Sequence, residues 1–209
     1  MNDPRATVIE AVSSREVALE AQRTRPLRAD AQQNHDRLLD VAARLFARDG
    51  ADASLKAIAR EAGVGIGTLY RRFPTREELV EATYRSETER LCAAAATLLA
   101  DHDPPTALRA WLAGFLGYTA TKHGMAEALP AILASREGLR MRSRDMLAEA
   151  IATILRAGVQ DGSLRADVAA TDVLMAVGGV TLVAGHERDD ALAARLLDLI
   201  MDGLAATAR

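Results

Sequence analysis

The 209-residue chain has few aromatic residues, few lysines, a single cysteine and no long hydrophobic run. Aromatic side chains make up 3% of it, and its two lysines stand against 24 arginines. Few aromatics, together with many alanines and leucines, favour helices over sheets. The lone Cys92 excludes an intrachain disulfide and fits a reducing cytoplasm. We expect Cys92 to be a packed small hydrophobic residue, with a redox-sensing thiol as the alternative.

Several functional classes lack their sequence signals. The longest apolar run, residues 173–185, contains Gly178 and Gly179 and is shorter than the roughly 20 residues of a membrane span. The first residues have no apolar core, so a signal peptide is not expected. The four histidines have no metal-ligand spacing, and neither a GxSxG segment nor a phosphate-binding glycine loop occurs. We therefore expect no enzymatic activity, no metal and no cofactor.

Residues 54–76, SLKAIAREAGVGIGTLYRRFPTR, carry the strongest functional signal. Ser54 suits a helix N-cap, and the apolar residues after it recur at helical spacing up to Gly63, where a glycine with positive φ suits a turn. Leu69 and Phe73, four apart, give a second helix its inward face. The outward positions are then Thr68, Tyr70, Arg71 and Arg72. Two short helices joined by such a turn form a helix-turn-helix, whose second helix enters the major groove of DNA.

The same stretch is basic although the chain as a whole is acidic. Residues 56–76 carry five basic side chains and one acidic, Glu61, in a chain of net charge −3. This concentration fits a surface that faces phosphates, and a solvated helix face is the alternative. Residues 86–209 carry 12 basic and 16 acidic side chains, so we do not expect the C-terminal part to contact DNA.

The segment GVGIGTLYRRFPTREEL, preceded by a helix ending in LFARDG, resembles the DNA-binding domain of TetR-family transcriptional regulators. The resemblance covers about residues 30–84, and Arg76 stands where the family often has lysine. It implies an all-α fold of about nine helices. A three-helix helix-turn-helix domain (30–84) would be followed by an effector-binding and dimerisation domain (85–209). Residues 1–29 are expected to be a flexible extension, either inert or contacting DNA through Arg23, Arg25 and Arg28.

The resemblance and the outward positions together predict the residues that bind double-stranded DNA. Tyr70 is expected to donate its hydroxyl to a phosphate, although a half-buried packing role is the alternative. Arg71 or Arg72 is expected to grip a guanine edge, and the choice between them stays open. Arg76 is expected to contact phosphate beside a helix N-terminus. The full predicted set is Ser54, Lys56, Gly65, Ile66, Gly67, Thr68, Tyr70, Arg71, Arg72 and Arg76.

One helix-turn-helix covers little DNA, so we expect a homodimer on a palindromic operator. The family resemblance also implies release by a small-molecule effector. The predicted dimer interface consists of Leu174, Gly178, Thr181, Leu182, Leu192, Leu196, Leu199 and Ile200. The predicted effector pocket consists of Trp111, Phe115, Tyr118, His123, Met125, Leu129 and Met141. Both sets have burial within the monomer as the alternative. The expected function is a cytoplasmic repressor, and an effector-independent DNA-binding structural protein is the alternative.

The helical periodicity also predicts the order of elements. A first helix over 32–49 has a buried stripe that includes Leu38, Leu45 and Phe46. A capping box at residues 75–78 opens a helix to about residue 100, followed by a linker at 101–105. Further helices are predicted over residues 106–122, 125–134 with a break or kink at Pro130, 139–160, 168–184 and 190–206.

Overall fold

The computed structural model describes residues 30, 32–187 and 189–206. Within them, helices joined by short turns make up the fold, and no strand occurs. The order is a first helix (residues 32–49), η1 (Gly50–Asp52), α2 (Leu55–Glu61), α3 (Ile66–Arg72), α4 (Arg76–Asp101), α5 (Pro104–Gly124), α6 (Leu129–Ser135), α7 (Glu137–Asp161), α8 (Ala170–Glu187) and α9 (Asp190–Leu204). The prediction of an all-α chain of about nine helices is confirmed. The predicted extension, with Arg23, Arg25 and Arg28, lies outside the described residues.

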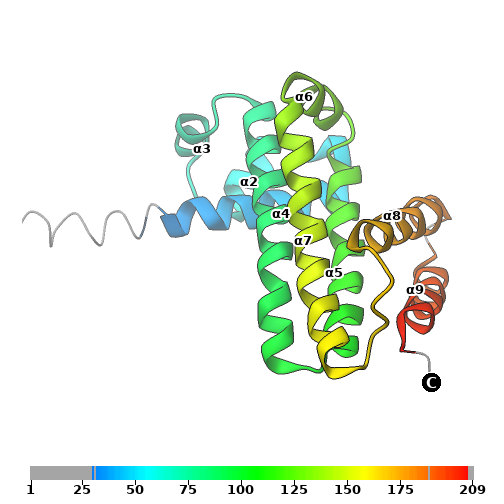
Figure 1. Cartoon of the computed structure of the whole chain (residues 1–209). Helices are drawn as coiled ribbons and strands as arrows, with labels where there is room; N and C mark the ends of the chain where they lie inside the picture. The colour runs from blue at the N-terminus through cyan, green and yellow to red at the C-terminus, as the bar shows by residue number, and fades with distance from the viewer. Residues whose placement is uncertain (1–29, 31, 188, 207–209) are drawn as a thin grey trace, which may run out of the picture.

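Three long helices, α4, α5 and α7, run side by side as a bundle (Figure 1). In Figure 1, α2 and α3 lie on one side of this bundle, the first helix runs from that side behind the bundle, and α8 and α9 lie on the other side. The short α6 sits at the end of the bundle nearest the helix-turn-helix. No helix of the described chain is both long and apolar enough to cross a membrane.

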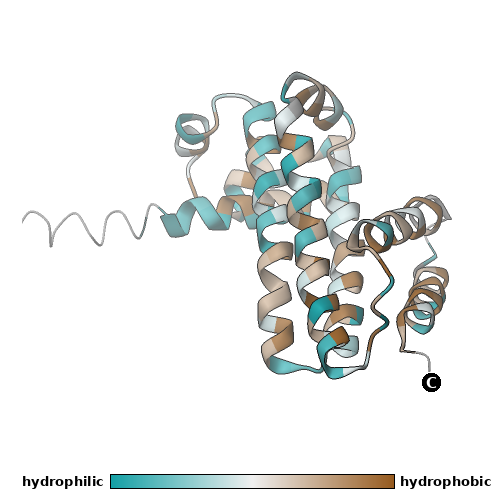
Figure 2. Cartoon of the chain, in the orientation of Figure 1, coloured by the Kyte–Doolittle hydropathy of each residue, from teal (hydrophilic) through white to brown (hydrophobic). Residues whose placement is uncertain are grey.

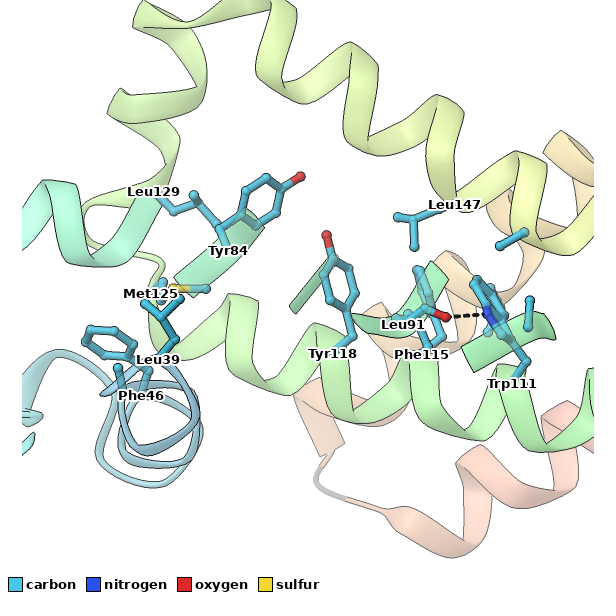
Figure 3. Packing of buried hydrophobic residues seen from close by; sticks show 14 of the residues in the cluster. Leu39, Phe46, Tyr84, Leu91, Trp111, Phe115, Tyr118, Met125, Leu129 and Leu147 are labelled. Atoms are coloured by element: carbon cyan, nitrogen blue, oxygen red, sulfur yellow. Dashed lines mark hydrogen bonds between the residues drawn. The ribbon is translucent and has the colours of Figure 1, made fainter. Parts of the chain in front are cut away.

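One large buried cluster fills most of the space between these helices, and a small second cluster lies between α8 and α9. The large cluster extends from Leu38 in the first helix to Leu204 at the end of α9, so it includes side chains from both predicted domains. It includes the fully buried Trp111, whose indole N–H donates to the Leu91 carbonyl oxygen at 2.8 Å (Figure 3). The helix α4 passes through the predicted boundary at residues 84 and 85 without interruption. The division into residues 30–84 and 85–209 therefore stays a prediction.

The local signals read from the sequence set several helix ends. The Ser54 hydroxyl accepts from the Ala57 N–H at 3.1 Å, and the Thr75 hydroxyl accepts from the Glu78 N–H at 3.2 Å. Each side chain thereby pairs an amide that the first turn of a helix leaves open. Gly50 follows the first helix with φ of 59°, a conformation that residues with a Cβ rarely adopt.

Two expected interruptions of helices were wrong, and several expected helix ends differ from the structure by two or three residues. The predicted linker at 101–105 is reduced to residues 102 and 103, because Asp103 caps α5 and the two prolines after it form its first turn. Proline fits there, since the first amides of a helix have no internal partner. Pro130 likewise lies in the first turn of α6 and does not break a helix over 125–134. The last helix ends at Leu204, two residues before the predicted end.

Candidate nucleic-acid interface

The first helix and α2 support the helix-turn-helix through their apolar faces. The predicted stripe of the first helix is buried, with Phe46 and Ala42 completely so. In α2, Ile58, Ala59 and the capping residue Ala62 are at most 2% exposed, and Leu55 packs against the same cluster. The position of α3 is therefore set by a hydrophobic base that the sequence pattern already indicated.

The turn between α2 and α3 has the hydrogen bonds of a Schellman motif. The Gly63 N–H donates to the Arg60 carbonyl at 3.1 Å, and the Val64 N–H donates to the Ala59 carbonyl at 3.0 Å. This pattern needs a left-handed residue directly after the helix cap, and Gly63 supplies it with φ of 70°. The turn thus ends α2, and α3 begins at Ile66, three residues after Gly63.

The two faces of α3 separate as predicted. Leu69 is buried, as is Phe73 at the helix cap, while Tyr70 is 49% exposed. The remaining outward positions, Thr68, Arg71 and Arg72, are exposed as well. Gly65 is the N-cap of α3, and the first helical residues Ile66 and Gly67 are also exposed. The residues of this helix that are expected to contact DNA are therefore all accessible to solvent.

The two arginines of α3 differ in what holds them. One terminal nitrogen of Arg71 donates to the Thr68 hydroxyl at 3.1 Å, within the same helix. Arg72 instead donates from Nε to Nδ1 of His35 in the first helix, also at 3.1 Å. The His35 ring stacks on Phe73 with centroids 5.5 Å apart. Burial, and next the nearby Arg72 charge, lower the pKa of His35, which favours the neutral ring that accepts this bond.

Arg76, the first residue of α4, links this helix to the helix-turn-helix. Its guanidinium donates to the carbonyl oxygens of Ala53 at 2.5 Å and Ala51 at 3.0 Å, and it lies 5.3 Å from the Phe46 ring centroid. These contacts tie α4 to the segment that joins the first helix to α2. No sequence pattern indicates this role, because the partners of Arg76 are backbone groups more than 20 residues away. The predicted phosphate contact of Arg76 stays a prediction beside it.

The other predicted DNA residues lie around α2. Lys56 and Ser54 are exposed at its start, and Arg60, which is not in the predicted set, is exposed near its end. On the side toward the first helix, Arg44 and Glu61 form an ion pair at 3.6 Å. Glu61 is the one acidic residue of the basic stretch, and the ion pair with Arg44 partly neutralises the negative charge of Glu61. An exposed pair of this kind contributes little to stability.

The seven residues predicted for an effector pocket do not surround one cavity. Phe115, His123 and Leu129 line a groove between α5, α6 and α8. Tyr118 lines a different hollow between the first helix, α4 and α5, and Met141 lines a third beside α6. Trp111 and Met125 are buried in the main cluster. Figure 3 shows Trp111, Phe115 and Tyr118 in a row along α5.

The predicted dimer residues differ widely in exposure. Leu182 and Leu199 are 67% and 66% exposed, whereas Leu174 and Thr181 are buried within the chain. Leu192, Leu196 and Ile200 are half-buried, and a Cβ added at Gly178 would meet nothing within 4 Å. The sequence reading missed two further exposed side chains on α8, Met175 and Val183. Figure 2 shows hydrophobic residues along both helices.

Cys92 has the properties of a structural thiol. Its side chain is half-buried, and burial, followed by the nearby Glu89 charge, raises its pKa to about 11. A thiol with that pKa is almost entirely protonated at neutral pH and is a poor nucleophile. No group of three or more potential metal ligands occurs in the described part of the chain.

Two family models match this chain. The model for "Bacterial regulatory proteins, tetR family" matches residues 38–83, and that for "Transcriptional regulator SbtR-like, C-terminal domain" matches residues 103–206. Together they span the helix-turn-helix and most of the helices that follow α4.

Solved structures of bacterial regulators share the whole fold. The TetR transcriptional regulator SCO0520 from Streptomyces coelicolor is 46% identical with a TM-score of 0.77, over 83% of this chain and 99% of that one. A TetR regulatory protein from Mycobacterium vanbaalenii is 31% identical with a TM-score of 0.71, over 86% of this chain and 99% of that one.

A sequence relative matches over a shorter segment. An HTH-type transcriptional regulator from Staphylococcus aureus (strain USA300) is 41% identical over 54 residues, which span 29% of its length.

Proposed function

The chain belongs to the TetR family of transcriptional regulators, and from this we propose that it is a homodimeric repressor that a small molecule releases from a palindromic operator. It is a DNA-binding regulator with a helix-turn-helix. The observation that carries the finer proposal is the exposed face of α3, where Tyr70, Arg71 and Arg72 stand on a rigid hydrophobic base. A cytoplasmic location follows from this function, since the operator lies on the chromosome.

The proposal assigns different roles to the two arginines of α3. Arg71 is held only within its own helix and reads a base edge in the major groove. Arg72 is anchored to the first helix through His35 and contacts the phosphate backbone. Tyr70 donates to a phosphate and fixes the register of α3, and Lys56 adds a phosphate contact from α2. Ser54, Gly65, Ile66, Gly67 and Thr68 complete the proposed contact surface.

The test is selection of bound fragments from a random DNA pool, using the full chain at about 150 mM salt. We expect an enriched inverted repeat with half-sites about 34–36 Å apart, or a related spacing. Arg71→Ala is expected to lose about 1–3 kcal/mol of discrimination at one position of each half-site. Arg72→Ala is the matched variant, and it weakens binding about evenly across sequences. Equal losses on all sequences for both variants would contradict the assignment.

An effector-independent DNA-binding structural protein is the second candidate. It predicts that scrambled DNA competes as well as any selected fragment, with binding that declines smoothly as salt rises. The acidic balance of residues 86–209 disfavours it, because a non-specific binder gains affinity from positive charge over its whole surface.

The proposed dimer forms through α8 and α9. Met175, Leu182, Val183 and Leu199 are each at least 50% exposed, which leaves apolar surface on two neighbouring helices. A second copy that covers this face buries it, and Gly178 and Gly179 allow helices to approach closely. The predicted domain division at residue 84 belongs to the same proposal, with residues 30–84 binding DNA and 85–209 binding the second copy and the effector.

Charged substitutions test the dimer more cleanly than removal of α9, which would expose Val180 and Ala184 of α8, because these two residues pack against Ala193 of α9. Leu182→Glu and Leu199→Glu change exposed side chains, so the fold is expected to persist while light scattering reports monomers. Met146→Glu, at a 41% exposed position on α7, is the matched control and should stay dimeric. A dimer that survives both leucine variants would place the interface elsewhere.

A further inference from the structure

The groove between α5, α6 and α8 has the size and lining of a small-molecule site. Its volume is about 380 Å³, within the range of pockets that bind small organic ligands. Apolar side chains from all three helices form most of its wall: Phe115, Leu129, Pro130, Leu133 and Leu182. A ligand that fills this space must therefore be largely apolar.

The charged side chains that line the groove are of one sign. Lys122 and His123, in the last turn of α5, are its basic residues, and no acidic residue lines it. Neither forms an ion pair with another described residue, and both are exposed. The hydroxyls of Thr119 and Thr181 already donate to the carbonyls of Leu116 and Gly178. The N–H donors available to a ligand are therefore those of Lys122 and His123.

We infer that this groove binds an apolar monocarboxylate, with the carboxylate against Lys122 and the hydrocarbon along Phe115, Leu129 and Leu133. The ammonium group of Lys122 stands at the edge of the apolar groove and can pair with a carboxylate, so the negative charge of the ligand is not buried without a partner. The inference rests on the proposed function, because it names the chemical class of the effector. It does not depend on which operator the protein binds.

The groove is joined to the DNA-binding unit through the end of α5. Gly124 directly follows His123, and a Cβ on Gly124 would lie 1.8 Å from the Phe46 carbonyl oxygen. The Phe46 ring in turn packs beneath Arg76, which holds the carbonyls of Ala51 and Ala53 just before α2. A ligand that moves the last turn of α5 therefore moves the support of α2 and α3. Such a change alters DNA affinity only if the ligand prefers one of the two arrangements.

The test compares three probes with the same chain and different head groups: decanoate, decan-1-ol and decylamine. Each is titrated into the full-length protein without DNA, with fluorescence of the sole tryptophan as the readout. Trp111 suits this purpose because it stacks on Phe115, a groove residue, with centroids 6.0 Å apart. We expect decanoate to bind about tenfold more tightly than either other probe, because one charge-assisted hydrogen bond contributes about that factor to affinity.

Variants of Lys122 separate charge from shape. Lys122→Gln is expected to weaken decanoate binding about tenfold and to leave decan-1-ol unchanged, while Lys122→Arg restores decanoate binding. Arg140→Gln removes the same charge from the neighbouring hollow beside α6 and should change neither probe. Equal affinity for decanoate and decan-1-ol, or no effect of Lys122→Gln, would overturn the inference. The inference is also overturned if decanoate binds the Leu199→Glu monomer but not the dimer. In that case a second copy of the chain occupies the groove in the dimer.

Operator binding is measured separately, by fluorescence anisotropy with the selected DNA fragment. If decanoate binds the groove and leaves operator affinity unchanged, the ligand class stands and the effector role fails. If the protein selects no DNA sequence at all, the proposed repressor fails, while the fluorescence titrations still decide what the groove binds.

Discussion

Replacing Gly124 by alanine tests the contact between the end of α5 and the helix that supports the helix-turn-helix. An added Cβ would lie 1.8 Å from the Phe46 carbonyl oxygen, 2.4 Å from its carbon and 3.1 Å from the Ala47 nitrogen. All three atoms belong to the backbone, so no side-chain rotation relieves the clash. Because a Cβ essentially never approaches within 3.0 Å, the first helix and α5 must separate by about 1.2 Å or more.

The expected cost follows from two opposing effects. Overpacking of a well-packed contact costs about 1–3 kcal/mol. Alanine in place of a helical glycine returns up to about 1 kcal/mol, and less at the last residue of a helix. We therefore expect Gly124→Ala to lower the free energy of unfolding by about 1–2 kcal/mol, and the melting temperature by about 2–8 °C for a chain of this size. Operator affinity should fall as well, since the strain lies beneath α2 and α3.

Gly117→Ala provides a matched control on the same helix. Gly117 is exposed, and a Cβ placed there would meet nothing within 4 Å. The same substitution is therefore expected to raise the free energy of unfolding by about 0.5–1 kcal/mol. Urea denaturation followed by circular dichroism measures both variants, with the slope of the transition checked for constancy. If Gly124→Ala is as stable as Gly117→Ala, the close approach of α5 to Phe46 is refuted.

Three further predictions concern side chains whose roles the structure defines. Arg76→Ala should lower the free energy of unfolding by about 1.5–3 kcal/mol, because charge-assisted hydrogen bonds to two carbonyl oxygens are lost. Arg71→Ala, at an exposed position, should change the free energy of unfolding by less than about 0.5 kcal/mol. Urea denaturation measures both variants. The folded-state pKa of His35 lies below its ordinary 6.5, so its contribution to stability is present above pH 6.5 and lost as pH falls through the lower value. Denaturation midpoints should therefore fall on acidification, and less so in His35→Asn; identical pH profiles would refute this. Alkylation of Cys92 by iodoacetamide at neutral pH should be at least about 100-fold slower than in urea-unfolded protein, and equal rates would contradict the raised pKa.

The sequence specified the helix-turn-helix closely because its signals are local. The caps at Ser54 and Thr75 and the turn at Gly63 each depend on hydrogen bonds between residues three to five apart. Apolar spacing likewise identifies the inward Leu69 and the outward Tyr70 from a single helix. Such patterns are visible in a chain without knowing what packs against it.

Other local patterns were ambiguous. Proline suits both a linker and the first turn of a helix, so the sequence predicts a linker at residues 101–105, although most of this segment is helical. Pro130 was misread for the same reason. At residue 103 the choice falls to the helix, because the Asp103 carboxylate accepts from the Thr106 N–H at 2.9 Å and caps α5.

The amino-acid sequence by itself determined the all-α fold, the helix-turn-helix and the face of α3 that points to solvent, because periodicity and capping act within one helix. The tertiary structure decided how those parts are joined. It placed Arg76 on backbone groups 23 and 25 residues away, Arg72 against His35, and Gly124 against Phe46. It also placed the seven expected pocket residues in different hollows or in the core, and it placed Lys122 and His123 at the groove between α5, α6 and α8. These relations depend on the angles and distances at which helices pack, which the order of residues along one helix does not encode.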